Sequence, residues 1–195
     1  MADNFKLDVD ADGIALITWD MPGKSMNVID MAVIQELSAL VEKIAADAAI
    51  KGAVITSGKD TFCAGADLTL LDSLTRMFAD MAKKEGEVAA ATLLFNESRK
   101  LSQLYRRIET CGKPFAAAIN GTALGGGFEL CLASHHRVAA ENDKTRLGLP
   151  EVKIGLFPGA GGVPWRLGLG IGLHPLLRGL DHVARRHHRV DELHR

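Results

Sequence analysis

Apolar and polar residues alternate in two short stretches near the N-terminus, residues 5–9 and 14–19, which flank Asp10-Ala11-Asp12-Gly13. A period of two predicts a pair of half-buried strands, and the polar residues ending in glycine predict a hairpin turn between them. From Met31 to Ile44 the apolar residues instead recur every three or four positions. This spacing predicts a helix, with Asp30 as its N-cap.

The next hundred residues continue this exchange of strand and helix patterns. Continuous apolar runs predict buried strands at 52–57 and 115–119, and helical spacing predicts helices at 68–108, broken near 83–86, and at 129–133. A strand near 137–140 and extended stretches around Leu147 and Val152 complete the pattern. Strands that alternate with helices indicate an α/β architecture.

The composition fits one globular domain. The chain has 195 residues, 47% hydrophobic and 24% charged, which is enough to bury a core. No apolar run approaches the roughly 20 residues of a membrane span, and no basic segment precedes an apolar one at the N-terminus. Three cysteines without metal-ligand spacing are expected to be reduced thiols, and the protein is expected to be cytoplasmic without a membrane span.

The composition changes near Gly162. All eleven lysines lie at or before Lys153, whereas six of the twelve arginines and five of the seven histidines follow residue 162. Residues 1–162 carry 17 basic and 21 acidic side chains, against 6 and 3 in residues 163–195. We therefore expect a folded core at 1–162 and an atypical Arg/His-rich tail at 163–195, as in a chain truncated or frame-shifted after about Gly162.

The histidines of the tail suggest one rival interpretation, a metal or nucleic-acid module built on His182, His187, His188 and His194. His182 and His187 are five residues apart and do not share a helix face cleanly. Cysteine partners are missing, and no aromatic residues interleave with the arginines after Trp165. A weakly ordered tail is the favoured interpretation, with no metal and no nucleic acid bound.

Two glycine-bearing stretches carry the candidate chemistry. Phe62-Cys63-Ala64-Gly65-Ala66-Asp67 and Gly121-Thr122-Ala123-Leu124-Gly125-Gly126-Gly127-Phe128-Glu129 each follow an apolar strand. The triple glycine lets the main chain approach a ligand, and the helix beside it offers free N–H groups and the positive end of its dipole. We take the amides of Ala66 and Gly126 as two donors to one ligand oxygen.

Two glutamates join these donors. Glu129 lies three residues past Gly126, on the first turn of a helix, and Glu151, held in extended geometry beside Pro150, comes from another segment. When two carboxylates lie beside one water, one can take a proton from the water while the other transfers a proton at the α-carbon. With two backbone donors for the oxyanion, this set suits a thioester enolate. Cys63 is interpreted as a small buried filler rather than as a nucleophile.

These motifs resemble the crotonase (enoyl-CoA hydratase/isomerase) superfamily over about residues 5–162. The similarity runs through the two glycine stretches and through Pro150-Glu151 followed by residues 155–162. Residues 21–27 and the long helical segment after Asp67 are most similar to the N-terminal hydratase part of multifunctional fatty-acid-oxidation α-chains. The resemblance implies a spiral of stacked β-β-α turns, whose C-terminal helical region is incomplete or altered here.

The resemblance also implies a site. In the family the oxyanion hole falls on the positions matching Ala66 and Gly126, and the catalytic acids on those matching Glu129 and Glu151. Coenzyme A is expected over the Lys24–Met26 loop and the Ala64–Leu68 turn. The expected substrate contacts are Lys24, Met26, Ala64, Asp67, Leu68, Leu124, Gly125, Pro150 and Gly159. Coenzyme A is part of the substrate, so no separate cofactor is expected.

The expected function is enoyl-CoA hydration in fatty acid β-oxidation. An enoyl-CoA isomerase, or an inactive assembly fragment of a multifunctional α-chain, stays open as an alternative. NAD chemistry is not expected, because neither Gly159-Ala160-Gly161 nor Gly168–Gly172 has a dinucleotide-binding fingerprint in its proper context. The family further implies an acyl-CoA partner and assembly as a homotrimer or an α/β oxidation complex.

Overall fold

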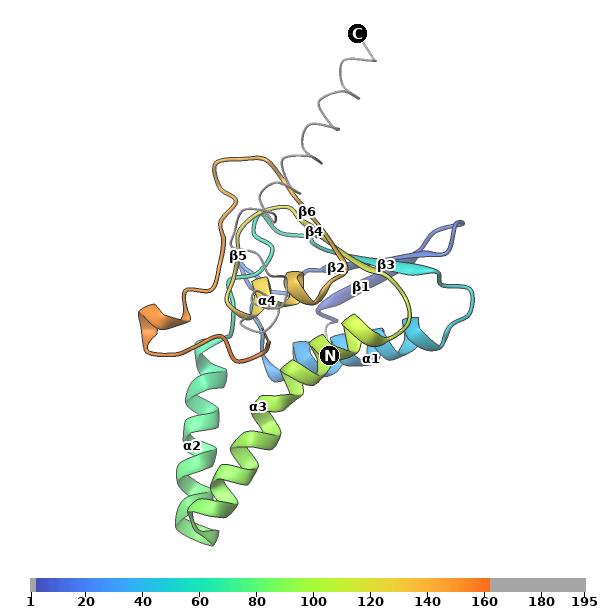
Figure 1. The fold of residues 1–195 in the computed structure, drawn as a ribbon. Helices are drawn as coiled ribbons and strands as arrows, with labels where there is room; N and C mark the ends of the chain where they lie inside the picture. The colour runs from blue at the N-terminus through green and yellow to red at the C-terminus, as the bar shows by residue number, and fades with distance from the viewer. Residues whose placement is uncertain (1–2, 162–195) are drawn as a thin grey trace, which may run out of the picture.

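The computed structural model describes residues 3–161, so every expectation about residues 162–195 lies outside the described residues. A five-stranded sheet in the order β1-β2-β3-β4-β6 forms the centre, and a two-stranded sheet, β5-β7, lies apart from it. Helices α1 and α3 lie along one face of the larger sheet (Figure 1). The α/β architecture expected from the sequence is confirmed.

The elements follow one another closely along the chain. Their bounds are β1 Phe5–Val9, β2 Ile14–Trp19, α1 Met31–Ala46, β3 Gly52–Ser57, α2 Leu68–Glu85, α3 Glu87–Thr110, β4 Phe115–Ile119, β5 Ala123–Leu124, α4 Gly126–Ala133, β6 His136–Ala139, β7 Leu147–Gly148 and the 3-10 helix η1 Glu151–Ile154.

The predicted N-terminal hairpin is present. β1 and β2 pair antiparallel, and Gly13 supplies the left-handed turn with a φ of 82°. The following pairs, β2 with β3, β3 with β4 and β4 with β6, are all parallel. Neighbouring parallel strands end at the same edge of a sheet, so the loops that follow β3 and β4 begin side by side.

Helix α1 begins as predicted. The Asp30 side chain accepts a hydrogen bond from the Val33 amide at 2.8 Å, which satisfies one of the free donors at the helix start. One face of α1 is buried against the sheet, through Val33, Ile34, Leu37, Val41 and Ile44. This packing explains the periodicity seen in the sequence.

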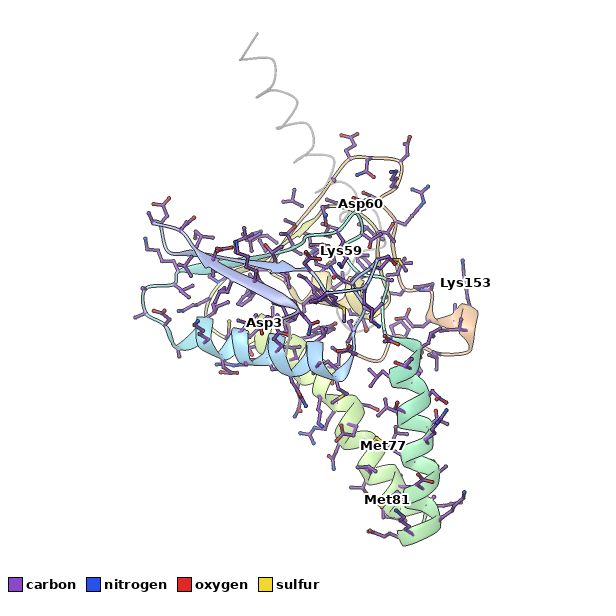
Figure 2. The ribbon with its side chains drawn as sticks, turned by 180° about the vertical axis from the view of Figure 1, so that it is seen from behind. Asp3, Lys59, Asp60, Met77, Met81 and Lys153 are labelled. Carbon is purple, nitrogen blue, oxygen red and sulfur yellow. The ribbon has the colours of Figure 1, made fainter. Side chains whose placement is uncertain are left out.

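Helices α2 and α3 form an arm that extends beyond the sheet (Figure 1). The predicted break is confirmed, because Gly86, with a φ of 91°, separates the two helices. α2 has no buried residue, and Met77 and Met81 lie along its outer part (Figure 2). The opposite end of α3 instead buries Leu104, Tyr105 and Ile108 in the core.

Two local predictions need correction. α4 begins at Gly126, three residues earlier than expected, because the Gly125 carbonyl accepts from the amides of Phe128 and Glu129. The extended geometry expected at Glu151 and Val152 is wrong. Proline has a backbone angle compatible with a helix start, and the Lys153 amide closes a turn onto the Pro150 carbonyl at 2.9 Å.

Candidate functional site

The chain after β3 runs between two other segments. On one side the Ile29 amide donates to the Gly65 carbonyl at 2.8 Å, and the Asp67 amide donates to the Ile29 carbonyl at 2.8 Å. On the other side Cys63 pairs in parallel with Ala123, and the Leu124 amide donates to the Cys63 carbonyl at 3.0 Å. Residues 63–67 are therefore fixed beside the segment that leads into α4.

The Ala66 amide faces away from Ile29. In a trans peptide the carbonyl and the N–H point in opposite directions, and the Gly65 carbonyl of this peptide is bound by Ile29. The N–H accordingly points to the side on which Leu124 and Gly125 lie. Within residues 3–161 it donates no hydrogen bond, and Ala66 is exposed. This amide is available to a ligand.

The Gly126 amide is available for a similar reason. The carbonyl of the same peptide, that of Gly125, accepts from Phe128 and Glu129 at 2.9 and 3.0 Å, so the N–H points out of the helix start. No described residue accepts from it. A Cβ at Gly126 would lie 2.7 Å from Cδ1 of Ile29, the residue that pairs with Ala66. The two predicted donors are thus brought to one place.

Glu129 is held inside the protein by α4. The residue is 2% exposed, and its Oε1 accepts a hydrogen bond from the Ala160 amide at 3.0 Å. Its own amide binds the Gly125 carbonyl, which places it one helical turn from the glycines. This contact also brings Gly159, an expected substrate contact next to Ala160, to the same end of α4.

Glu151 reaches the glycine turn from η1. Its Oε1 lies 3.4 Å from the position a Cβ would take at Gly125, whose φ is 53°. Its Oε2 is buried and has no hydrogen-bond partner among the described residues. η1 lies beside the start of α2 in both views (Figures 1 and 2), and Lys153 lies on its outer side (Figure 2). The structure therefore brings both predicted carboxylates to the same glycine turn.

The expected coenzyme A segments also lie together. The Ala64 amide donates to the Asn27 carbonyl at 2.9 Å, and Lys24 Nζ lies 2.7 Å from Asp67 Oδ2. The ammonium of Lys24 and the hydroxyl and amide of Thr69 hold the pKa of Asp67 at about 2. Met26 and Leu68 are exposed beside this pair, at 44% and 72%. The other expected contacts, Leu124, Gly125 and Pro150, are partly or fully buried next to Glu151.

Cys63 is fully buried, which agrees with its interpretation as a filler. Burial raises the pKa of its thiol to about 12, so the sulfur stays protonated. The sulfur accepts a hydrogen bond from the Gly65 amide at 3.3 Å and thereby braces the turn that carries Ala66.

Sequence reasoning missed two residues that build the site. The buried Asn27 amide binds the carbonyls of Trp19 and Phe62 and the Ser57 hydroxyl, which ties the loops together. The Tyr105 hydroxyl donates to the Gly126 carbonyl at 2.7 Å. A tyrosine on the apolar face of a predicted helix was the available signal, because a buried hydroxyl requires a partner.

Residues 3–161 contain no group of three or more His, Cys, Asp or Glu side chains that could hold a metal ion. None of the helices described for the chain combines the length and apolar character that crossing a bilayer would require.

Comparison with protein families gives one match over most of the chain. A family described as enoyl-CoA hydratase/isomerase matches residues 10–172. A fatty acid oxidation complex subunit alpha from Idiomarina loihiensis is 41% identical over 181 residues, which cover 91% of this chain and 24% of the relative. The same subunit from Shewanella amazonensis is 40% identical over 183 residues, with 92% and 24% covered. The chain spans about a quarter of the length of these relatives.

Solved structures show the same fold. An enoyl-CoA hydratase from Bacillus anthracis matches with a TM-score of 0.69 and 28% identity, covering 87% of this chain and 60% of the other. An enoyl-CoA hydratase/isomerase from Xanthobacter autotrophicus Py2 matches with a TM-score of 0.62 and 28% identity, covering 80% and 52%. The crotonase-like fold is confirmed. The domain boundary at residue 162 and the altered C-terminal region stay predictions.

Proposed function

The chain belongs to the enoyl-CoA hydratase/isomerase family, and from this premise we propose that it hydrates enoyl-CoA thioesters in fatty acid oxidation. One observation carries the proposal. Two backbone amides without an acceptor among residues 3–161, those of Ala66 and Gly126, lie with the carboxylates of Glu129 and Glu151 around one glycine turn. Fold alone would not support a reaction, because related folds carry different sites.

The two amides would stabilise the thioester oxygen as the reaction proceeds. Adding water at the β-carbon moves negative charge onto the thioester oxygen and forms an enolate, which must be stabilised more than the starting carbonyl. Backbone donors suit this role because they are fixed in place and do not titrate, and losing one such donor typically raises a barrier by roughly 3–4 kcal/mol. We assign this role to Ala66 and Gly126.

The two glutamates would divide the proton transfers. One carboxylate removes a proton from water while the oxygen attacks the β-carbon, and the other delivers a proton to the α-carbon of the enolate. The product then carries the hydroxyl of the water on its β-carbon and the proton of the second carboxyl on its α-carbon. The first carboxyl returns to solvent the proton that it took, and the second takes one up, so each turnover consumes one water. The buried Oε2 of Glu151, without a described partner, and Oε1 of Glu129, held by the Ala160 amide, would both face the added water.

The substrate would lie across the loops that surround these groups. We place coenzyme A over Lys24, Met26, Ala64, Asp67 and Leu68, where the Lys24 ammonium is exposed beside the Asp67 carboxylate. The thioester would lie at Leu124 and Gly125, between Pro150 and Gly159. Coenzyme A enters with the substrate, so the reaction as proposed uses no other cofactor.

The wider setting is part of the proposal. The curated relatives are named as subunits of a fatty acid oxidation complex, which makes such a complex, or a homotrimer, the proposed assembly. The cysteines of the described residues, Cys63, Cys111 and Cys131, form no disulfide. This supports a cytoplasmic location, since reducing compartments keep thiols free.

Hydration of crotonyl-CoA, followed by loss of the conjugated enoyl absorbance, tests the proposal. Wild type should consume the substrate, and Glu129→Gln and Glu151→Gln should each lower the rate by about 10²–10⁴-fold, because an amide cannot exchange the proton. Glu87→Gln, at the remote exposed end of the arm, is the matched control and should leave the rate unchanged.

Two outcomes would contradict hydration. If folded wild type were as inert as both glutamate variants, the assembly interpretation would replace catalysis. If wild type instead converted a 3-enoyl-CoA to the conjugated isomer but left crotonyl-CoA untouched, the protein would be an isomerase.

A further inference from the structure

Tyr105 lies where α3 packs against α4. Its side chain is 1% exposed, and its hydroxyl donates to the Gly126 carbonyl at 2.7 Å. It is the only tyrosine of the chain. A phenylalanine would fill the same space without the hydroxyl, so the polar group calls for an explanation of its own.

The hydroxyl acts on the first residue of α4, a glycine that has no side chain to limit its backbone conformation. Glycine populates many backbone conformations, and a donor in an oxyanion hole requires one of them. The peptide before Gly126 is held through the Gly125 carbonyl by Phe128 and Glu129. The peptide after Gly126 has its carbonyl bound by Tyr105. The two peptides that flank the Gly126 Cα are therefore held from separate directions.

The same side chain also forms part of the wall beside Gly126. A Cβ built there would lie 2.7 Å from Ile29 Cδ1, 3.6 Å from Leu101 Cδ2 and 3.7 Å from the Tyr105 hydroxyl. Because Ile29 pairs with Ala66, this wall links the two candidate donors. Tyr105 thus contacts the Gly126 backbone directly and lies close to its Cα.

The hydroxyl keeps its proton. Burial raises the pKa of Tyr105 well above its ordinary value of 10.0, and the nearby Glu129 carboxylate acts in the same direction. The Tyr105 hydroxyl therefore remains a hydrogen-bond donor near neutral pH.

We propose that Tyr105 is a positioning residue, whose hydroxyl holds Gly126 in the orientation that its amide needs to bind the oxyanion. This inference rests on the proposed hydration. It adds a residue that supports the reaction without contacting the substrate, through a hydrogen bond to the carbonyl next to the donor.

Tyr105→Phe tests the proposal with a probe that does not need turnover. A conjugated dienoyl-CoA absorbs at longer wavelength when its carbonyl accepts strong hydrogen bonds, so the spectral shift on binding reports the donors. We expect a red shift with wild type that falls by half or more in Tyr105→Phe. With crotonyl-CoA, kcat should fall about 10- to 100-fold, as for a misplaced catalytic group, while KM changes little.

Thr56→Val is the matched control. It removes a hydroxyl that donates to a backbone carbonyl, that of Ala118, at 3.0 Å within the sheet, and it preserves the side-chain shape. The red shift and kcat should stay at wild-type values. If Tyr105→Phe also matched wild type in both measurements, the positioning role would be wrong.

The two measurements separate this proposal from the proposed function. A wild type that shifts the dienoyl spectrum but does not hydrate crotonyl-CoA would contradict hydration, and the Tyr105→Phe spectrum would still decide the positioning role. A folded wild type with neither shift nor turnover would overturn both.

If Tyr105→Phe failed to fold, 3-fluorotyrosine at this single tyrosine would replace it. Its fluorine resonance should move when the dienoyl-CoA binds, and a fixed resonance would contradict the proposal.

Discussion

Gly127 shows how closely the two glycine stretches pack. A Cβ at this position would lie 2.5 Å from Cβ and 2.7 Å from Sγ of Cys63. Cys63 is itself fully buried and binds the Gly65 amide through its sulfur. The third glycine therefore serves the contact between the two segments, and the two small residues fit only as a pair.

Gly127→Ala should destabilise the protein. The added methyl has no space, and overpacking of a tight core typically costs about 1–3 kcal/mol. Urea unfolding measures the difference. Gly148→Ala is the control, because its Cβ would meet nothing within 4 Å, and it should stay within about 0.5 kcal/mol of wild type. Equal unfolding free energies for the two variants would contradict the packing argument.

The sequence indicated residues that the structure brings together as a candidate site, but it did not indicate the residues that support them. Ala66, Gly126 and Glu129 stand in motifs whose residue types and spacing suggested the candidate site. Tyr105 could not be connected with Gly126 in this way, because its partner is a backbone carbonyl 21 residues away, which any residue type provides. Supporting contacts of this kind depend on how two helices meet.

At the scale of elements, Asp67 joins the start of α2 to the loop that carries Lys24. Its Oδ1 accepts from the Thr69 amide at 2.8 Å and caps the helix, while Oδ2 binds Lys24. Hydrogen bonds from the Lys24 ammonium and from the hydroxyl and the amide of Thr69 lower the pKa of the Asp67 carboxyl from 3.8 to about 2. The Asp67 side chain thus connects the start of α2 with the Lys24 loop, directly after Ala66 in the chain.

Asp67→Asn should destabilise the protein near neutral pH by an amount that disappears in acid. Asparagine still caps a helix but cannot pair with Lys24. A carboxyl whose pKa is lowered on folding stabilises the folded state above its unfolded pKa, and this contribution is lost as pH falls from about 4 to about 2. Urea unfolding of both proteins across this range measures it, and a difference that did not change with pH would be evidence against the ion pair.

Strong local signals predicted most elements, and one weak signal misled. The break between α2 and α3 follows from Gly86, which takes a φ of 91° between two runs of helical apolar spacing. The extended geometry expected at Glu151 rested only on Pro150, and proline fits the start of a helical turn equally well. The sequence does not distinguish an extended segment from a helical turn at this position, and the structure has the helical turn.

At the scale of the whole molecule, the order of the strands explains why distant residues meet. β3 and β4 are parallel neighbours, so the chain leaves both at the same edge of the sheet. The loop after β3 leads to Ala66, and the loop after β4 leads to Gly126. The alternation of elements predicted an α/β fold but not which strands are neighbours, and that neighbour relation creates the candidate site.

A crystal structure of the protein with a bound acyl-CoA tests the central claim most directly. We expect the thioester oxygen within about 2.7–3.1 Å of both the Ala66 and the Gly126 amide nitrogens, the distances expected of an oxyanion hole. The carboxylates of Glu129 and Glu151 should lie on either side of the water beside the reacting carbons. A thioester oxygen that contacts neither amide, in a complex that retains this fold, would contradict the account.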